Sequence, residues 1–387
     1  MTERAPTPVE AAPVEAAPVA RANEVEVAPA WKLMWWRFRK HKLAVLSAWI
    51  LAVIVVIAVI PEFFATQRPD ETSARRAYIP PQPIRIIHDG RLVRPYVLGV
   101  TGQRNPVTLA MEWVQDTEIR IPVVLFARGF EYRALGLIPG SRHIVGPADG
   151  EAGGQATRVH LMGTDRLGRD QWSRLMYGTR ISMSIGLVAV ALSVFLGVLL
   201  GGISGYVGGV TDLVIQRTIE LLQSLPAIPI WLALSAAVPR TWPVTHVYFA
   251  ITIILALIGW TQLGRQVRGR FLALREEDFV TAARLIGCSR GRIIFAHMVP
   301  SFMSHIIAAT TLAIPLMIIN ETFLSFLGLG LRPPAISWGV LLQEAQNLQS
   351  VVNAPWLLLP GVAVVVTVLT LNILGDGIRD AADPYST

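Results

Sequence analysis

Long runs without a charged residue divide the chain into membrane-sized pieces. An α-helix rises about 1.5 Å per residue, so about 20 apolar residues cross the hydrocarbon core of a bilayer. Six such runs predict an all-α polytopic membrane protein with six transmembrane helices. The runs are Leu43–Ile60, Ile181–Thr211, Leu221–Pro239, Thr241–Leu263, Ser301–Asn320 and Pro355–Gly375.

The composition agrees with a membrane protein. Of the 387 residues, 52% are hydrophobic and 16% are charged, whereas soluble domains carry about 25% charged residues. The formal net charge of +7 suits a nucleic acid or an anionic lipid as partner. Because the arginines are scattered between apolar runs, the pattern argues against a nucleic acid. The single cysteine, Cys288, excludes an intrachain disulfide bond.

The N-terminal part divides into two segments. Residues 1–30 form a Pro, Ala, Glu and Val tract that predicts a disordered tail and lacks the pattern of a signal peptide. Residues 31–64 join the tryptophan-rich, basic segment Trp31–Lys42 to the first apolar run. Tryptophan favours the headgroup region and basic clusters stay cytoplasmic. We therefore expect an interfacial helix on the inner side and then the first transmembrane helix.

Residues 65–175 form a long polar insert, which one preceding span would place outside the cytoplasm. Two turn signals between apolar runs predict β-hairpins, one at His88-Asp89-Gly90-Arg91 and one at Ala127-Arg128-Gly129. The sequence therefore predicts an extracytoplasmic β-rich insert. The flanking runs are Ile84–Ile87 and Leu92–Val97 for the first hairpin, and Ile121–Phe126 and Phe130–Leu135 for the second.

The segment His160–Arg180 leads from the insert into the second span. Thr164 is a suitable cap for a short helix. Trp172, Leu175 and Met176 would give that helix an apolar face at the outer surface. The segment is either a structural elbow or a substrate contact, and both interpretations stay open.

Residues 176–380 hold the other five runs and predict a five-helix membrane core, which places both chain termini in the cytoplasm. Pro226 and Pro229 predict a kink or break in the third span. Small residues at four-residue spacing allow close helix approach in lipid. Such a stripe fits either an interface between two subunits or a contact inside the chain. Its members are Gly197, Gly201, Gly205 and Gly209.

Residues 265–300 join the fourth and fifth spans. Seven arginines against three acidic residues predict a cytoplasmic loop. Gly287 can end a short helix in this loop, and Ser289 can cap a second one. An uncovered apolar face on the first helix would dock in a partner's groove or fold back on the membrane surface. That face is formed by Phe279, Ala282, Ala283 and Ile286.

The same loop resembles the EAA loop of ABC-transporter permease subunits. Thr281-Ala282-Ala283, Gly287 and Pro300 match the spacing of that motif, and Asp278-Phe279 precedes it. Thr281 stands where the motif has glutamate. The resemblance implies that this short helix is a coupling helix that fits a groove on a cytoplasmic ATPase. We call residues 265–300 the coupling loop.

Two further stretches are similar to the second, C-type permease of dipeptide, oligopeptide and nickel importers. They are GTD-x-x-GRD within His160–Arg180 and the glutamate before LSFLGLG, Glu321. The resemblance implies a type I importer fold in the inner membrane and a heterodimer with a second permease. It also implies an extracytoplasmic substrate-binding protein, and ATPase subunits that bind ATP and Mg²⁺, with no cofactor in this chain. Members of the family import peptides, and relatives take oligosaccharides or nickel chelates.

Glu321 is a carboxylate at the end of an apolar run. Such groups usually face protein or a water-filled cavity. We predict that Glu321 lines the substrate path or a gate. The alternative is a buried structural hydrogen-bonding or ion-pair partner.

Catalytic signatures are absent from the sequence. It contains no G-x-x-x-x-G-K-[ST], no H-E-x-x-H, no CxxC and no G-x-S-x-G. We therefore predict no catalytic or metal site and no membrane enzyme. A stand-alone ion-coupled transporter is the alternative of another class, but it would show inverted repeats and paired intramembrane charges.

Overall fold

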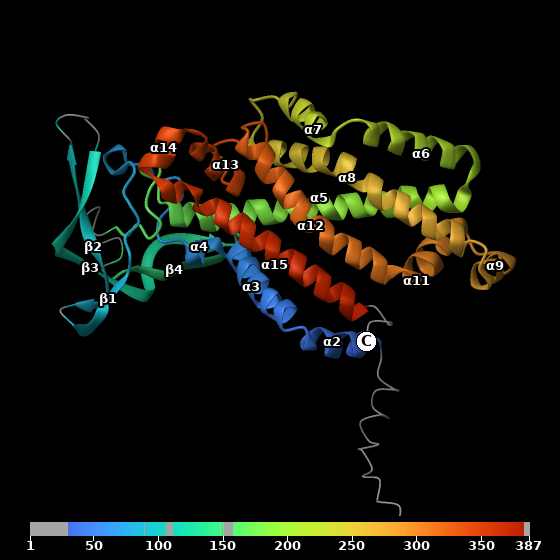
Figure 1. Ribbon diagram of the computed structural model, residues 1–387, viewed down its shortest axis with the longest axis horizontal. Coiled ribbons are helices and arrows are strands. Elements are labelled where there is room, and N and C mark those ends of the chain that lie inside the picture. The colour runs from blue at the N-terminus through green and yellow to red at the C-terminus, as the bar shows by residue number, and fades with distance from the viewer. Residues whose placement is uncertain are drawn as a thin grey trace, which may run out of the picture.

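A bundle of long helices with a four-stranded sheet at one end makes up the molecule (Figure 1). The computed structural model describes residues 30–88, 90–104, 106, 111–148, 150 and 158–382. The predicted disordered tail, residues 1–30, lies outside this range except for Ala30.

The first helices follow the predicted order. Helix α2 (Ala30–Lys40) and helix α3 (Lys42–Val59) meet at His41, whose Nδ1 accepts a hydrogen bond from Ala44 N at 3.1 Å. Helix α3 lies within one residue of the first predicted span at each end, and several of its valines are exposed, as expected for lipid-facing side chains. The short helix α4 (Pro61–Phe64) follows directly and leads into the insert.

Helix α5 (Gln171–Val207) is one continuous helix of 37 residues. It joins the predicted surface helix to the second span. The prediction that its apolar face lies at a surface is wrong, because Leu175 and Met176 are buried against Trp338 inside the bundle.

Thr164 does not cap this helix. Asp170 is the N-cap, and its carboxylate accepts a hydrogen bond from Ser173 N at 2.8 Å. The hydroxyl of Thr164 accepts from Ile79 N at 2.8 Å and donates to Arg76 O at 2.6 Å. Thr164 therefore holds the insert in place instead of starting a helix.

The third predicted span, Leu221–Pro239, covers only the last turn of α6 (Gly209–Ser224) and all of α7 (Ala227–Ala236), two helices that meet at 88°. Pro226 is the N-cap residue of α7, in an extended conformation. Because proline lacks an N–H donor and its ring obstructs the preceding turn, it breaks the helix here. The predicted break at Pro226 is confirmed.

The remaining helices complete the bundle. Within the described residues, five helices are long and apolar enough to cross a membrane, or six if the pair α6–α7 is one span. After α7 the helices are α8 (Val244–Leu274), α9 (Asp278–Leu285), α10 (Arg290–Arg292), the π-helical turn η3 (Ile293–Met298), α11 (Val299–Ser301), α12 (Met303–Phe326), α13 (Trp338–Gln343), η4 (Glu344–Gln346), α14 (Leu348–Asn353), η5 (Pro355–Leu358) and α15 (Leu359–Ala382).

The insert contains an antiparallel sheet with the strand order β1-β2-β3-β4. The first predicted hairpin is confirmed, because His88 pairs with Arg91 across its turn. The strands are β1 (Arg85–His88), β2 (Arg91–Arg104), β3 (Met111–Ala134) and β4 (Ile138–Pro147).

The second predicted hairpin is wrong, because β3 continues through residues 127–129. Gly129 is needed for close packing, since a Cβ there would lie 2.6 Å from the His143 ring. The turn falls at Leu135 and Gly136, which have φ values of 53° and 75°. Two central residues with positive φ are typical of the tight turns that join antiparallel strands.

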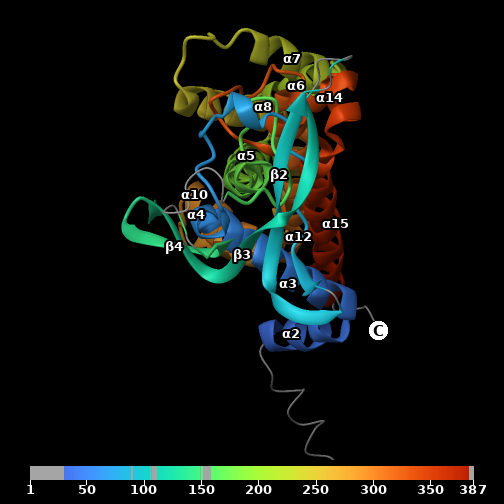
Figure 2. The same ribbon diagram turned by 90° about the vertical axis from the view of Figure 1, so that its left-hand side faces the viewer.

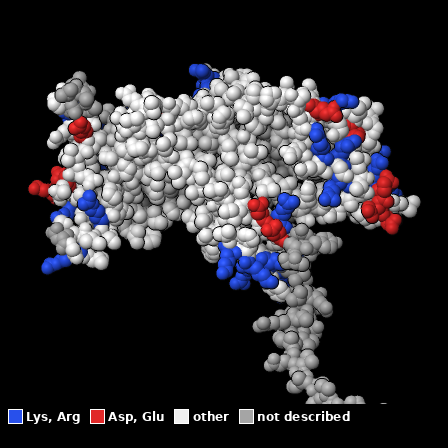
Figure 3. Space-filling view, in the orientation of Figure 1, with Lys and Arg blue, Asp and Glu red and all other residues white. Residues whose placement is uncertain are grey.

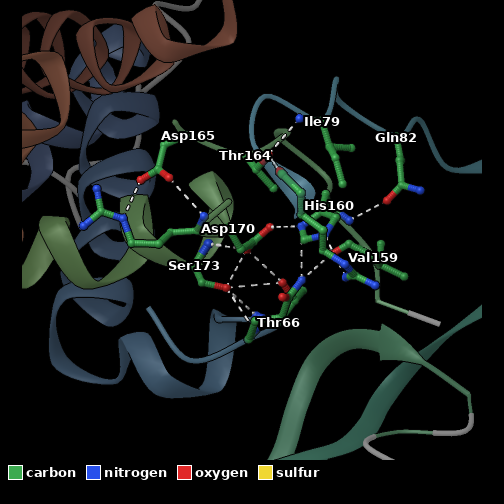
Figure 4. Close-up of polar contacts among 12 residues, drawn as sticks. Thr66, Ile79, Gln82, Val159, His160, Thr164, Asp165, Asp170 and Ser173 are labelled. Atoms are coloured by element: carbon green, nitrogen blue, oxygen red, sulfur yellow. Dashed lines mark hydrogen bonds and ion pairs between the residues drawn. The ribbon is translucent and has the colours of Figure 1, made fainter. Parts of the chain in front are cut away.

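A buried polar cluster joins the insert to the start of α5 (Figure 4). One oxygen of Asp170 lies 3.2 Å from His160 Nδ1. Its other oxygen accepts hydrogen bonds from the hydroxyls of Ser173 at 2.6 Å and Thr66 at 3.1 Å. These contacts tie segments about 100 residues apart in the sequence to one helix end. They support the interpretation of this segment as a structural elbow.

Charged side chains collect at the sheet end, at the coupling-loop end and over α2, with a largely uncharged belt between them (Figure 3). The long helix α5 runs through this belt (Figure 1). Viewed along the long axis, the sheet lies across the end of the helices (Figure 2). An uncharged belt between charged ends is the surface expected of a membrane-spanning protein.

Candidate functional site

The coupling loop is built around α9, which has two apolar faces. Val280 and Ala283 are buried, whereas Leu285 and Ile286 are 84% and 79% exposed. Ala283 is therefore on the inner face, which corrects the prediction of one outer face that included it. Residues three apart share a helix face, so Ala283 turns inward with Val280. The predicted residues Asp278, Phe279, Thr281 and Ala282 are exposed, as is Pro300 in α11.

The predicted end of this helix is confirmed. Gly287 has φ of 81°, which favours glycine. Its N–H donates to Arg284 O, and Cys288 N–H donates to Ala283 O, both at 3.0 Å. This pair of bonds is the Schellman motif. Ser289 then caps α10 through a hydrogen bond from Arg292 N at 3.4 Å.

The inner face of α9 packs on a buried apolar group that we call the loop core. Its members come from α5, α8, α9, the π-helical turn, α11 and α12, so α9 is fixed to several helices at once. The guanidinium of Arg284 also lies 5.3 Å from the ring of Tyr206 on α5. The buried members are Val198, Leu263, Val267, Phe271, Val280, Ala283, Ile293, Ile294, Met298, Val299, Phe302 and Ile306.

An ion pair at the same end holds α6 to α8. Arg268 Nε and Nη2 donate to the two carboxylate oxygens of Asp212, each at 2.6 Å. A two-pronged guanidinium–carboxylate contact fixes orientation as well as distance. The hydroxyl of Ser204 on α5 donates to the same carboxylate, so three helices meet at Asp212.

Three of the four stripe glycines lie at the contact between α5 and α8. A Cβ at Gly201 would lie 2.4 Å from Gly264 O, and one at Gly205 would lie 2.6 Å from Phe271 Cβ. A Cβ at Gly197 would lie 3.1 Å from Leu263. Of the two interpretations left open, the structure places these three at an internal contact.

Gly209, the fourth glycine of the stripe, lies elsewhere. It begins α6 with φ of 60° and faces open space. Gly208 before it also has positive φ, at 71°, and separates α5 from α6. The stripe therefore ends where the helix ends.

A groove of about 1040 Å³ lies between the broken pair α6–α7 and helices α8 and α12. Its walls are mostly apolar, with amide side chains placed among them. Sequence reasoning missed these residues, although amides within apolar runs are a recognisable signal of a buried or water-filled site. The amide residues are Gln223, Gln262, Gln266 and Asn320.

Glu321 does not line this groove. Its side chain is 0% exposed, and it accepts hydrogen bonds from Ser325 Oγ at 2.8 Å and Ser182 Oγ at 3.2 Å. The prediction that it faces water is wrong for this structure, and its environment matches the alternative of a buried hydrogen-bonding partner. Because each helical residue turns by about 100°, Asn320 faces the groove while Glu321 faces α5.

A second charged group lies near the N-terminal end of α5. Arg169 donates to Asp165 at 2.6 Å and to Glu344 at 2.9 Å, and Arg174 also donates to Asp165. Burial raises the pKa of the Glu344 carboxyl above its usual value, and the nearby Asp165 carboxylate raises it further. This network joins the GTD-x-x-GRD stretch to the segment before α14.

Two family descriptions match separate parts of the chain. Residues 197–385 match the binding-protein-dependent transport system inner membrane component. Residues 30–81 match the N-terminal transmembrane domain of oligopeptide transport permease C. The two matches lie on either side of the sheet, and residues 82–196, which include most of α5, lie between them.

Individual relatives agree with these matches. The oligopeptide transport system permease protein OppC of Bacillus subtilis is 37% identical over 229 residues, which are 59% of this chain and 72% of the relative. OppC of Haemophilus influenzae is 39% identical over 226 residues, 58% of this chain and 70% of the relative. The dipeptide permease DppC of Bacillus subtilis is 37% identical over 227 residues, 58% of this chain and 68% of the relative.

Among solved structures, a chain of the inward-facing MetNI methionine ABC transporter aligns with 54% of this chain and 96% of its own length, at 16% identity and a TM-score of 0.42. The sequence relatives are permease proteins of oligopeptide and dipeptide transport systems. The chain therefore belongs to the binding-protein-dependent ABC importer permeases, as a C-type subunit of the oligopeptide and dipeptide group, and it is a multi-pass inner membrane transport subunit, not an enzyme.

Proposed function

We propose that this chain forms half of the translocation pathway of an ATP-driven importer of peptides. A second permease supplies the other half, and an extracytoplasmic binding protein delivers the substrate. ATP and Mg²⁺ bind on separate ATPase subunits. The peptide class is supported by the names of the relatives, which are oligopeptide and dipeptide permeases.

In this proposal the chain crosses the membrane six times, with the broken pair α6–α7 as the third span. Both termini then lie in the cytoplasm, and the β-sheet lies outside. The groove between α6–α7, α8 and α12 supports the pathway assignment, because it combines apolar walls with amide groups. Amide groups can replace water around the peptide bonds of a passing substrate.

The division of α9 into two apolar faces is the observation that carries the proposal. Its outer residues, Leu285 and Ile286, lie in the open on a charged loop. Its inner residues, Val280 and Ala283, enter the loop core. A helix that packs on the loop core with one face and is exposed on the other is suited to dock in a groove of the ATPase. A displacement of α9 is then passed to the helices that contact it. A helix folded on the membrane surface would not need this internal anchor.

Ile286→Asp tests the docking. It adds a charge to the outer face without touching the loop core, so the permease should insert normally but lose ATPase association and uptake. Gly287→Pro should do the same, because proline cannot adopt φ of 81°. Leu92→Asp in the sheet is the control, since Leu92 is 85% exposed and far from the loop. Wild-type uptake together with wild-type ATPase co-purification in Ile286→Asp would contradict the proposal.

A further inference from the structure

The hairpin of β3 and β4 presents an apolar tip to the outside. Leu135, Leu137 and Ile138 surround the turn, and Leu137 is 82% exposed. Leu125 and Phe126 form a second exposed apolar pair farther back on β3, separated from the tip by Arg128 and Arg133. A soluble turn is usually polar, so this tip has the composition of a surface that is covered by something apolar.

Arginines stand behind this tip without acidic partners. Arg128 and Arg142 pair directly opposite each other on β3 and β4, and Arg133 lies nearer the turn. Like charges directly opposite each other destabilise a strand pair. None of the three forms an ion pair within the described part of the chain. An anion lying between Arg128 and Arg142 would turn this repulsion into attraction.

The hairpin is attached to the outer end of a candidate membrane span. His143 Nδ1 lies 2.9 Å from Glu62 O in α4, and the ring of Phe126 lies 6.1 Å from that of Phe63. Helix α4 follows α3 directly, after Ile60. In Figure 1, β4 lies beside α4, and in Figure 2 the hairpin extends sideways from α4 beyond the helices. The hairpin therefore leaves the bundle sideways at the end of the uncharged belt.

We propose that the β3–β4 hairpin lies on the outer leaflet of the membrane and inserts its tip among the lipids. Leu135, Leu137 and Ile138 enter the upper acyl region, where apolar side chains of interfacial segments are buried. Arg128 and Arg142 then sit at the level of the headgroups and share lipid phosphates. The lipid-facing surface of α3 continues into Phe126 through α4, which favours lipid over a protein partner as the occupant.

Site-directed fluorescence in lipid nanodiscs tests this arrangement on the full chain, purified in its membrane complex. A fluorophore that brightens in apolar surroundings is attached at Leu137→Cys in a Cys288→Ser background. Nitroxide-labelled lipids should quench most of its emission, and iodide in the water should quench little. Ile138→Cys provides a second attachment point on the same tip. Leu92→Cys is the matched control, because Leu92 is an exposed leucine beside the β1–β2 turn and outside the β3–β4 hairpin, and iodide should quench it.

Emission at Leu137→Cys that iodide quenches and lipid nitroxides do not would overturn the proposal, because the tip would then lie in water. Emission protected from both quenchers would also overturn it and would indicate a protein partner. The double variant Arg128→Gln/Arg142→Gln tests the phosphate contact separately. It should lose lipid quenching most strongly in nanodiscs containing phosphatidylglycerol, and unchanged quenching there would contradict a role for the arginines. None of these readings depends on uptake, so they stay independent of the transport proposal.

Discussion

Replacing Gly201 by alanine tests how tightly α5 and α8 are packed. The new Cβ would lie 2.4 Å from Gly264 O and 3.0 Å from Gly264 C and Cα. These are backbone atoms, so no side chain can rotate out of the way. The two helices would have to separate by about 1 Å to reach ordinary contact distance. That separation would loosen the loop core, which both helices share.

The cost follows from two opposing effects. Overpacking a buried contact costs about 1–3 kcal/mol. Alanine in place of a helical glycine gains about 1 kcal/mol. Gly269→Ala is the matched control, because Gly269 lies within α8 and a Cβ there meets nothing within 4 Å. The gain in helix propensity from glycine to alanine is common to both variants. Their free energies of unfolding should therefore differ by the steric cost alone, about 1–3 kcal/mol.

Thermal or denaturant unfolding of the purified chain in detergent measures this difference. Gly269→Ala should match or exceed the wild type in stability, and Gly201→Ala should fall below it. If the two variants unfold together, α5 and α8 do not approach closely. The glycine stripe would then be free to serve an interface with the second permease.

Two further outcomes are expected. Glu321→Leu removes the acceptor of the Ser182 and Ser325 hydroxyls and should cost about 1–3 kcal/mol of stability for each buried group left unpaired. Glu321→Gln keeps an acceptor oxygen, so its melting temperature should lie closer to that of the wild type. Equal losses of melting temperature in the two variants would show that these hydrogen bonds do not stabilise the fold. The pKa of Glu344 is raised in the folded state. The contribution of Glu344 to folding stability is therefore complete below its pKa in the unfolded chain, about 4.3, and is lost as pH rises through its pKa in the folded protein. The melting temperature of the wild type should therefore fall over that window relative to Glu344→Gln, and parallel pH profiles would contradict the assignment.

The spans and the coupling loop were accessible from the sequence because each depends on a local signal. An uncharged run fixes a membrane helix, Pro226 breaks one, and Gly287 ends one. The same reasoning fails where a residue serves a distant contact. Gly129 resembled a turn residue, but it is needed because the His143 ring packs on it from β4. Thr164 resembled a helix cap, but its hydroxyl is occupied by the backbone of residues 76 and 79.

Errors at the candidate site concern which way a helix faces. Periodicity placed Ala283 with Phe279, although the inner direction of α9 is set by Val280, which enters the loop core. The choice between Asn320 and Glu321 is of the same kind, because one step along α12 separates the groove from the buried serines. Sequence alone gives the spacing of residues on a helix. The rotation of that helix depends on neighbours that are distant in the sequence.

Helix α8 runs without a break from the loop core to the groove. Val267 and Phe271 of α8 belong to the loop core, and Gln262 and Gln266 of the same helix line the groove. A continuous helix transmits displacement along its length because its hydrogen bonds resist local bending. On the opposite wall α12 also reaches the loop core, through Ile306, but the π-helical turn and the short α11 interrupt the chain between α9 and α12. Movement of α9 should therefore shift the α8 wall more than the α12 wall, which changes the width of the groove instead of carrying both walls together.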